Sequence, residues 1–246
     1  MGIAMMLKHT TFLKFRPGLQ RDAADRRWRD ELGPLVLALP GLERYVQNPV
    51  VITTTNDGAV DGPPGFDGFG SMWFTDMAAF DAALASPEWA DAQACASEIF
   101  DTSWRNGEAS AEIEERVRRV GMGAVPDGVS TPPGDPIKLI GLLRYRPDMS
   151  REHANDYWRT THGSIALTIE EMGHYTQNHA IRGTAGRHVA AFDGYSEAWF
   201  ADFATYERAM ASTPWRNLTA DGPELFDMSV FLSGIVRERV LKEYRR

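Results

Sequence analysis

Two histidines in the last third of the chain could carry proton-transfer chemistry. His162 lies in the stretch "DYWRTTHG" (156–163), and His179 lies in "YTQNHAI" (175–181). Because an imidazole has a pKa near neutrality, a histidine in a cavity can take a proton from a substrate or return one. If residues 175–181 form a strand, Tyr175 and Gln177 share the face of His179, since alternate residues point the same way. We therefore expect these three side chains to point together into a cavity.

An earlier part of the chain repeats these segments without their histidines. "YVQNPVVIT" (45–53) matches "YTQNHAIRG" (175–183), with Pro49 at the place of His179 and Leu32 at the place of His162. The match runs at an offset of 130 residues from Lys8, shifts once to 126 inside a loop, and then continues. Length changes of this kind cost little in loops. The pattern indicates an internal duplication.

The difference between the copies favours a working site in the second. Leu32 belongs to an apolar helix stripe, so His162 should be at least partly buried, and a lone histidine there is more often a structural core group than a catalyst. Two histidines in one copy favour function, because duplicated halves diverge when only one must keep its chemistry. We predict His179 as the main proton-transfer residue, supported by Tyr175. His162 is either its partner or a core residue.

The sequence pattern of each copy predicts a strand, a helix, two strands, a helix and a strand, in this order. Residues 138–145 and 228–236 form apolar runs typical of strands, and Ser150 and Asp202 are candidate helix caps. Ser86-Pro87 and Thr213-Pro214 predict further helix starts. This order is the ferredoxin-like β-α-β-β-α-β arrangement. We predict an α+β fold in which two tandem units close their sheets on each other as an intrachain pseudo-dimeric α/β barrel with a shared cavity.

The predicted boundaries follow from composition. The first unit covers residues 1–116, a Gly- and Pro-rich linker covers 117–136, and the second unit covers 137–246. The net charge of -8 argues against a nucleic-acid partner. A single cysteine, Cys95, fits a reducing compartment, and no apolar run is long enough for a signal peptide or a membrane span. We expect a cytoplasmic protein without a membrane partner.

Several motifs together resemble the EthD-type family of dimeric α/β-barrel proteins: Arg146-Pro147-x-Met149-Ser150, "DYWRTTHG" and "YTQNHAI". The resemblance covers both copies and implies that they replace the two subunits of a family dimer. The wider superfamily implies cofactor-free lyases, cyclases, isomerases and quinol oxygenases, with some haem-binding members. Members similar to EthD include dehydratases or decarboxylases of aromatic polyketides and accessory proteins beside oxygenases. The resemblance also implies a role for Asn178 in orienting substrate, although its strand parity places it opposite His179.

Three functions follow as alternatives. The first is a cofactor-independent lyase or cyclase that uses histidine acid–base chemistry on an apolar aromatic or polyketide-like substrate. The second is a ligand-binding accessory protein without turnover. The third is a haem protein with His162 or His179 as axial ligand. For each, we expect a substrate-binding surface that includes Asn178, Gln177, Trp158, Trp199 and Tyr45. Assembly into a homodimer stays open.

No metal site is expected. His174 and His179 lie five residues apart, so they face opposite sides of one strand and cannot share a metal ion. Glu197 shares the strand face of Trp199 and replaces Ser71 of the first copy. It either enters the cavity or lies exposed at an edge, and exposure is the commoner outcome for a glutamate.

Overall fold

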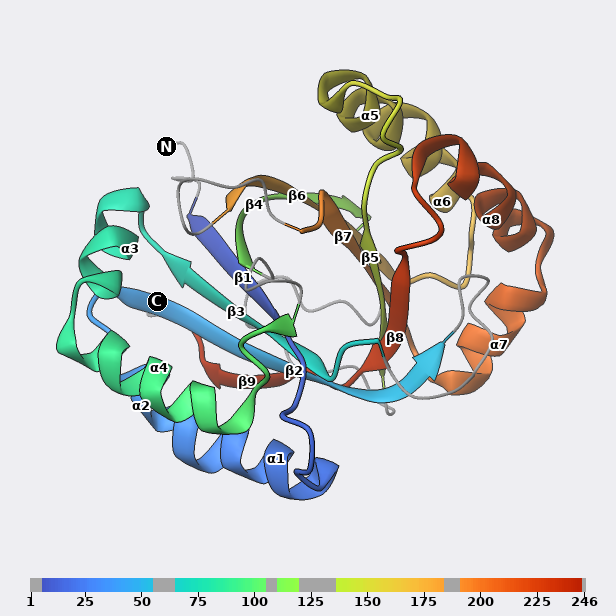
Figure 1. Cartoon of the computed structure of the whole chain (residues 1–246). Helices are drawn as coiled ribbons and strands as arrows, with labels where there is room; N and C mark the ends of the chain where they lie inside the picture. Colours follow the sequence, from blue (N-terminus) through green and yellow to red (C-terminus); the bar gives the residue numbers. More distant parts are fainter. Residues whose placement is uncertain (1–5, 55–64, 105–109, 120–135, 184–190, 245–246) are drawn as a thin grey trace.

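The computed structural model describes residues 6–54, 65–104, 110–119, 136–183 and 191–244. Both copies follow the predicted order of elements (Figure 1). The first contains β1 (Leu7–Leu13), α1 (Arg21–Arg27), the π-helical turn η1 (Trp28–Leu32), α2 (Gly33–Leu37), β2 (Leu42–Thr54), β3 (Gly68–Phe74), α3 (Met77–Leu84), α4 (Pro87–Ile99) and β4 (Ser110–Arg119). The second contains β5 (Ile137–Leu143), α5 (Arg151–Tyr157), the π-helical turn η3 (Trp158–His162), α6 (Gly163–Ala166), β6 (His174–Gly183), β7 (Gly194–Phe200), α7 (Phe203–Ala211), α8 (Thr213–Leu225), β8 (Leu232–Val236) and β9 (Arg239–Lys242).

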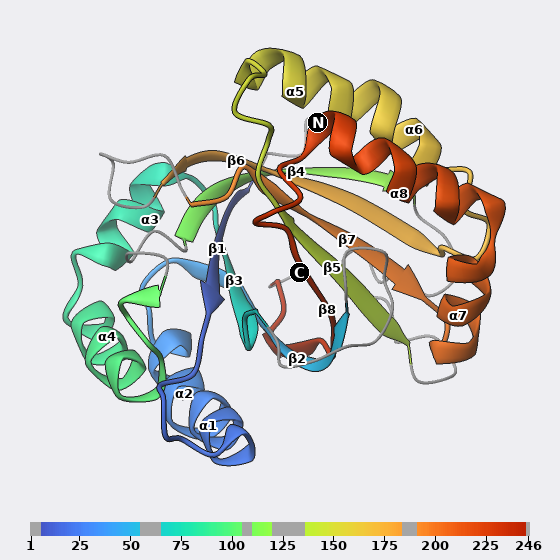
Figure 2. The same cartoon turned by 45° about the vertical axis from the view of Figure 1, so that its right-hand side comes forward.

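The strands of both copies close into one antiparallel barrel. Their order is β3-β1-β4-β6-β7-β5-β8-β2, and β2 pairs back with β3. The copies join where β4 pairs with β6 and where β2 pairs with β8. The helices of the two copies lie outside the barrel on different sides (Figures 1 and 2). The predicted pseudo-dimeric barrel is confirmed, and the two sheets also hydrogen-bond along their edges.

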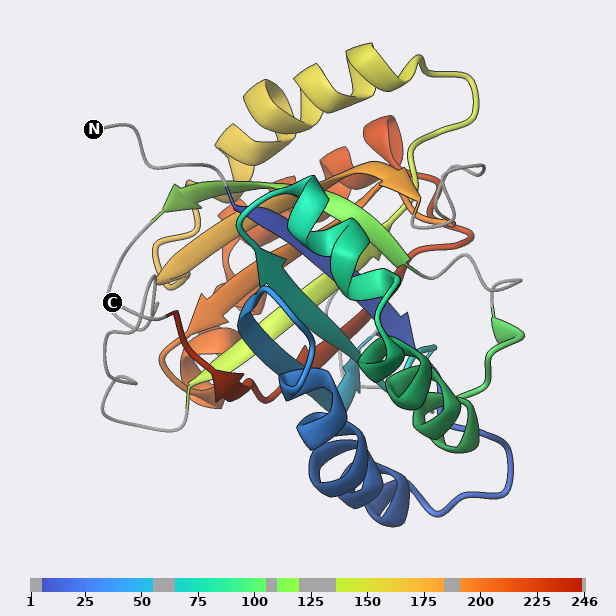
Figure 3. The ribbon, with the colours of Figure 1, turned by 90° about the vertical axis from the view of Figure 1, so that its left-hand side faces the viewer.

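One part of the barrel interior is filled by an aromatic cluster drawn from both copies. Phe12 packs against Phe66 and Phe69 of its own copy, and against Phe192 and Tyr195 of the other, with ring centroids 5.1–5.3 Å apart. All five side chains are buried. Because both copies contribute rings to this cluster, neither sheet buries its inner face without the other. The helices of the first copy cover the outer face of its sheet (Figure 3).

The repeated "FDG" motif fastens each helix start to the sheet. In the second copy, the Asp193 carboxylate accepts from the Tyr145 backbone N–H over 2.9 Å and pairs with Arg151 over 2.5 Å. Arg151 also donates to the Ala180 carbonyl of β6. The matching contacts of the first copy join Asp67 to Phe15, Arg21 and, through Arg21, to Val50. The motif therefore has a structural role in both copies.

Predicted local signals match the structure at the helix starts. The side chains of Ser150, Asp202 and Ser212 each accept a hydrogen bond from a backbone N–H three residues on. One boundary differs, because β4 continues to Arg119 through its pairing with β6, so the predicted linker start at 117 falls inside a strand. Residues 120–135 of that linker lie outside the described residues.

Within the described ranges, we find no helix that has both the length and the apolar character needed to cross a membrane.

The "FDG" glycine makes room for a buried tryptophan. A Cβ at Gly194 would lie 2.6 Å from the Trp158 ring, and one at Gly68 would lie 2.7 Å from the Trp28 ring. Both rings are buried, so they have little space to move. These glycines and tryptophans therefore repeat together because they pack together.

We expect Gly194→Ala to lower the free energy of unfolding by about 1–3 kcal/mol, since the methyl group overpacks the Trp158 site. Gly70→Ala in β3 is the matched control, because its Cβ would meet Tyr45 at 3.6 Å, an ordinary contact. That variant should change stability by about 1 kcal/mol at most, and in the stabilising direction. Denaturant titration measures both, and equal effects at the two positions would contradict this packing argument.

Candidate functional site

Strand β6 carries the predicted site residues on both of its faces. Asn178 points into the barrel, where its amide oxygen accepts from Lys8 over 2.9 Å. Tyr175, Gln177 and His179 point outward to the helices, since Tyr175 belongs to the helix-packed core and the other two contact η3 and α5. The prediction that these three residues face the barrel cavity is therefore wrong. Asn178, which parity arguments had placed outside, lies inside.

The error has a physical cause. The apolar residues at the matching places of the first copy, Val46 and Val50, favour a helix-packed face on the side of the strand opposite His179. Val50 instead belongs to the apolar cluster inside the barrel, and Val46 lines its opening. In a closed barrel both faces of a strand are buried, one against helices and one inside, so apolar residues along β2 do not by themselves mark the helix-packed face.

His179 is fixed by two polar partners from neighbouring elements. Its Nδ1 lies 2.9 Å from Asn155 Oδ1 on α5 and 3.4 Å from the Tyr145 hydroxyl after β5. The Tyr145 hydroxyl also donates to Asn155 Oδ1 over 2.5 Å. Because an amide oxygen only accepts, Nδ1 carries the proton and Nε2 keeps a lone pair. That Nε2 is buried and has no partner among the described residues.

The surroundings of His179 keep its ring neutral. Burial first, and then the positive charges of Arg116, Arg159, Arg151 and Arg118, together lower its pKa from 6.5 to about 3. The Trp158 ring packs against the imidazole with centroids 4.2 Å apart. A neutral imidazole with a free Nε2 can accept a hydrogen bond at physiological pH. The protonated form of the His179 ring is too strong an acid to keep its proton at physiological pH.

His162 forms a second polar pair at the end of η3. Its Nδ1 lies 2.8 Å from the Asp221 carboxylate of α8, and the Tyr157 hydroxyl donates to the same carboxylate over 2.8 Å. The hydrogen bond from His162 has the larger effect and that from Tyr157 the smaller, and both lower the pKa of Asp221. An ionised carboxylate only accepts, so His162 holds its proton on Nδ1 and keeps its lone pair on Nε2. The residue is 8% exposed and packs edge-on against Phe226.

The first copy has apolar residues at four of the five matching positions, and the charged Asp25 at the place of Asn155. At the offset that relates each segment, Leu32 replaces His162 and Cys95 replaces Asp221. Phe15 replaces Tyr145, and Pro49 replaces His179. We call the second-copy set Tyr145, Asn155, His162, His179 and Asp221 the outer histidine site. Sequence analysis missed Tyr145, Asn155 and Asp221, although comparing every polar residue of one copy with its counterpart would have found the Cys95–Asp221 difference.

Unpaired polar atoms gather next to the outer histidine site. In the first copy, Gln47 donates to the Trp28 carbonyl of η1 and accepts from Arg239 over 2.8 Å. In the second copy, Gln177 makes the matching bond to the Trp158 carbonyl over 2.7 Å. Its Oε1 is buried without a partner in the described part of the chain. Unpaired buried groups are rare in folded proteins, and a bound ligand is one explanation for them.

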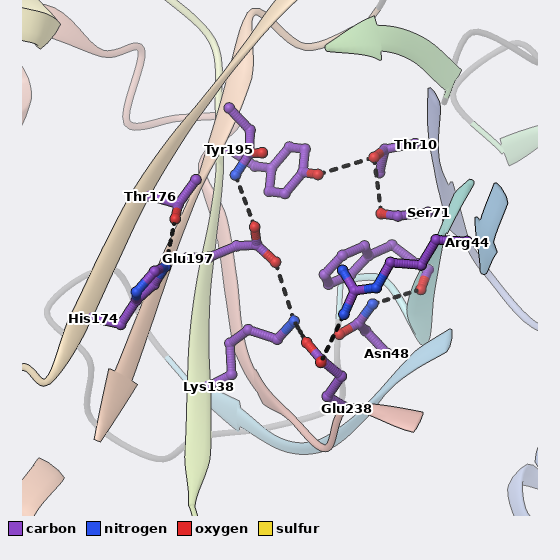
Figure 4. Close-up of polar contacts among 12 residues, drawn as sticks. Thr10, Arg44, Asn48, Ser71, Lys138, His174, Thr176, Tyr195, Glu197 and Glu238 are labelled. Atoms are coloured by element: carbon purple, nitrogen blue, oxygen red, sulfur yellow. Dashed lines mark hydrogen bonds and ion pairs between the residues drawn. The ribbon is translucent and has the colours of Figure 1, made fainter. Parts of the chain in front are cut away.

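The barrel interior also holds a charged network, which lies beside the aromatic cluster. The Glu197 carboxylate lies between two lysines, 3.3 Å from Lys8 of the first copy and 3.1 Å from Lys138 of the second. Lys138 also pairs with Glu238 over 2.6 Å (Figure 4). Lys8 lies 3.6 Å from Glu115. Glu197 and both lysines are buried. Of the two predicted alternatives for Glu197, the structure shows entry into the barrel.

This network follows the internal duplication. Lys8 pairs across its ladder with Ile113, and Lys138 pairs with Val236, so Glu115 and Glu238 occupy matching places two residues on. Each lysine also lies over a tryptophan of its own copy, at 5.0 Å for Trp73 and 4.6 Å for Trp199. We call the surrounding region the barrel mouth. It encloses a cavity of about 150 Å³ lined by Lys8, Arg44, Asn48, Ser71, Trp73, Glu115, Lys138, His174, Glu197, Trp199 and Glu238, among others.

The charges of the barrel mouth hold each other in their ionised forms. Burial alone would raise the pKa of Glu197, but Lys8 and Lys138 outweigh it and lower that pKa to about 2. Burial would likewise lower the pKa of Lys8, but Glu115 and Glu197 outweigh it and raise that pKa. Neither group exchanges protons near neutral pH. The network is suited to holding the two copies together and to binding charge, and it is unsuited to proton transfer.

The predicted substrate-binding residues do not form one surface. Trp199 lines the barrel mouth, whereas Trp158 packs outside the barrel against His179. Tyr45 lies in the helix-packed core of the first copy. Among the described residues, no three His, Cys, Asp or Glu side chains lie close enough together to hold a metal ion.

We expect Glu197→Gln to lower the free energy of unfolding at pH 7 by about 3–5 kcal/mol, because two buried ammonium groups lose their shared counter-ion. The exposed Glu170→Gln should change it by about 0.5 kcal/mol or less.

The pKa of Glu197 is lower in the folded chain, about 2 against an ordinary 4.5. The difference between wild type and Glu197→Gln should therefore be complete above pH 4.5 and disappear as the pH falls towards 2. Denaturant titration across this range tests the network, and equal stability of wild type and Glu197→Gln at pH 7 would contradict it.

Solved structures with this fold have low sequence identity to the chain. An anthrone oxidase-like protein superimposes with a TM-score of 0.63 at 10% identity, covering 98% of this chain and 95% of that one. A candidate monooxygenase from Fusobacterium nucleatum superimposes with a TM-score of 0.56 at 11% identity, with the same coverage of 98% and 95%. A candidate chlorite dismutase gives 0.50 at 11% identity, covering 96% of each chain. These likenesses show the fold.

None of the curated protein sequences compared with the chain matches it. The family model of the EthD domain matches residues 16–103 and again residues 146–229. The two matched segments fall one in each copy and together cover more than half of the chain. The chain therefore belongs to the EthD domain family, with two tandem domains that form one barrel.

Proposed function

We propose that the protein is a small-molecule enzyme whose outer histidine site moves a proton to or from an aromatic or polyketide-like substrate. The reaction class is elimination of water or carbon dioxide, or cyclisation, by acid–base chemistry that needs no cofactor. Membership of the EthD family is consistent with this class. The alternative is an accessory protein that binds the same type of ligand without turnover.

The observation that carries the proposal is the Asp221–His162 pair and its absence from the first copy. A carboxylate that accepts from Nδ1 fixes the tautomer of a histidine and stabilises the imidazolium formed when Nε2 takes a proton. The first copy keeps the same turn of helix with Leu32 and Cys95 in place of this pair. The fold therefore does not require the pair, which points to a role in chemistry.

The two histidines have different roles in the proposed reaction. His162 is the proton-transfer residue, because Asp221 supports its charged form. His179 is the orienting residue, because it stays neutral and offers Nε2 as an acceptor for a substrate hydroxyl or N–H. Asn155 and Tyr145 hold His179 in that tautomer. This assignment reverses the order expected from the sequence, which placed His179 first.

Proton transfer to or from carbon can be detected before the natural reaction is known. We expect the wild-type protein, incubated in heavy water with phenolic and polyketide-like carbonyl compounds, to exchange deuterium into at least one of them, measured by NMR. Loss of water or carbon dioxide from that compound would follow by mass spectrometry. His162→Leu should lower the exchange rate by about 10²–10⁴-fold, because general acid–base catalysis contributes that much.

The chain supplies its own matched control. The double variant His162→Leu, Asp221→Cys installs the pair found in the first copy and should keep the melting temperature of wild type while losing exchange. A His162→Leu protein that folds and exchanges at the wild-type rate would overturn the proposal. Ligand binding by wild type without exchange or turnover of any compound would support the accessory role. A Soret band on addition of haem that disappears in His162→Leu would instead indicate an axial ligand.

A further inference from the structure

The internal duplication shows that one half of the barrel mouth lacks a carboxylate. In the second copy, Asn178 donates from its amide nitrogen to the Glu197 carboxylate over 3.0 Å. The matching residues of the first copy are Asn48 and Ser71. Ser71 stands at the place of Glu197, and its short, uncharged side chain provides no carboxylate there. Asn48 instead makes a long contact of 3.5 Å to the Phe69 carbonyl. The first-copy half of the mouth therefore lacks one carboxylate that its partner half contains.

The donors that would hold such a carboxylate are already in place. Lys138 uses two of its three N–H groups on Glu197 and Glu238, which leaves one without a partner in the described ranges. The Ser71 hydroxyl lines the same cavity and contacts Thr10 over 2.9 Å. Asn48 is 1% exposed, and its amide nitrogen carries two N–H donors, of which the long contact to the Phe69 carbonyl uses one. Figure 4 shows Asn48, Ser71 and Lys138 projecting into the barrel interior from β2, β3 and β5.

The charge difference between the two halves favours an anion on this side. Arg44 lines the cavity at the place that His174 occupies in the second copy. Its guanidinium stacks on Trp73 at 4.7 Å, and its nearest carboxylates are Glu238 at 3.8 Å and Glu243 at 3.3 Å. Burial lowers the pKa of His174, so that half holds a neutral ring. Compared with the second-copy half, the first-copy half has the added positive charge of Arg44, which pairs with Glu243, and lacks the carboxylate of Glu197.

We propose that the barrel mouth binds a small monocarboxylate, whose carboxylate group lies beside Asn48, Ser71, Lys138 and Arg44. The cavity of about 150 Å³ is well below the roughly 300–1,000 Å³ of pockets for drug-sized molecules. The ligand is therefore short, with its carbon chain against Trp73. This site lies inside the barrel, while the outer histidine site lies on the opposite face of β6. The two sites are independent of each other.

Calorimetric titration with sodium formate, acetate, propionate and benzoate, at constant ionic strength set by sodium chloride, tests the site. We expect at least one of these anions to bind wild type saturably with one site per chain. Ser71→Glu places a carboxylate of the chain where the first-copy half lacks one and should abolish binding. Arg44→Gln should weaken it by about tenfold, through loss of a charged hydrogen bond. His162→Leu changes only the outer site and should bind as wild type does.

Three results would overturn the proposal: no saturable binding of any of the four anions, undiminished binding to Ser71→Glu, or loss of binding in His162→Leu. If Ser71→Glu does not fold, the nearly isosteric Asn48→Asp tests the site instead. The aspartate carboxylate would lie beside the carboxylate of the ligand and repel it. Binding to Asn48→Asp with wild-type affinity would then exclude the site.

Discussion

The Glu197 carboxylate, held between a lysine from each copy, is the interaction on which the arrangement of the two halves depends. A closed barrel removes its interior from water, so two ammonium groups inside it must be matched by negative charge. Glu197 touches both Lys8 and Lys138, and Asn178 bridges Lys8 to the same carboxylate. These contacts fix how the second copy is placed against the first. They lie beside the aromatic cluster, since Lys8 is over the Tyr195 ring at 5.4 Å and Lys138 is over the Phe69 ring at 5.5 Å. That cluster carries the apolar share of the same interface.

The duplication separates residues that build the fold from residues that differ by function. Asp67 and Asp193 fasten the helices in both copies, and Gly68 and Gly194 admit the paired tryptophans. These positions are the same because both halves need them. The outer histidine site and the two halves of the barrel mouth differ at residues that the backbone does not require. The same strand, β6, serves both regions, with Asn178 on its inner face and His179 on its outer face.

Much of the fold could be predicted from the sequence, because repeats, caps and strand order are local signals that the tertiary structure preserved. Ser150, Asp202 and Ser212 cap the helices at the expected places. The direction of the β6 side chains could not be read in the same way. An apolar alternation says that one face is buried, but in this barrel both faces are buried, one against helices and one inside. Glu197 was uncertain for a related reason, since its burial depends on Lys8, which lies 189 residues away. Asp221 could have been found from the sequence, because Leu32 and Cys95 of the first copy are both replaced by polar residues, His162 and Asp221, in the second.

The central claim is that His179 stays neutral and orients while His162, backed by Asp221, exchanges the proton. Nitrogen-15 NMR of the histidine rings in the free protein measures this directly, since the ring nitrogen shifts report both tautomer and charge. The account predicts that His179 shows the Nδ1–H tautomer and remains neutral from about pH 8 down to about pH 5, well above its lowered pKa. It also predicts that the Nδ1 proton of His162 is held in a hydrogen bond to a carboxylate. A His179 ring that carries its proton on Nε2, or that becomes charged near pH 6.5, would contradict the account.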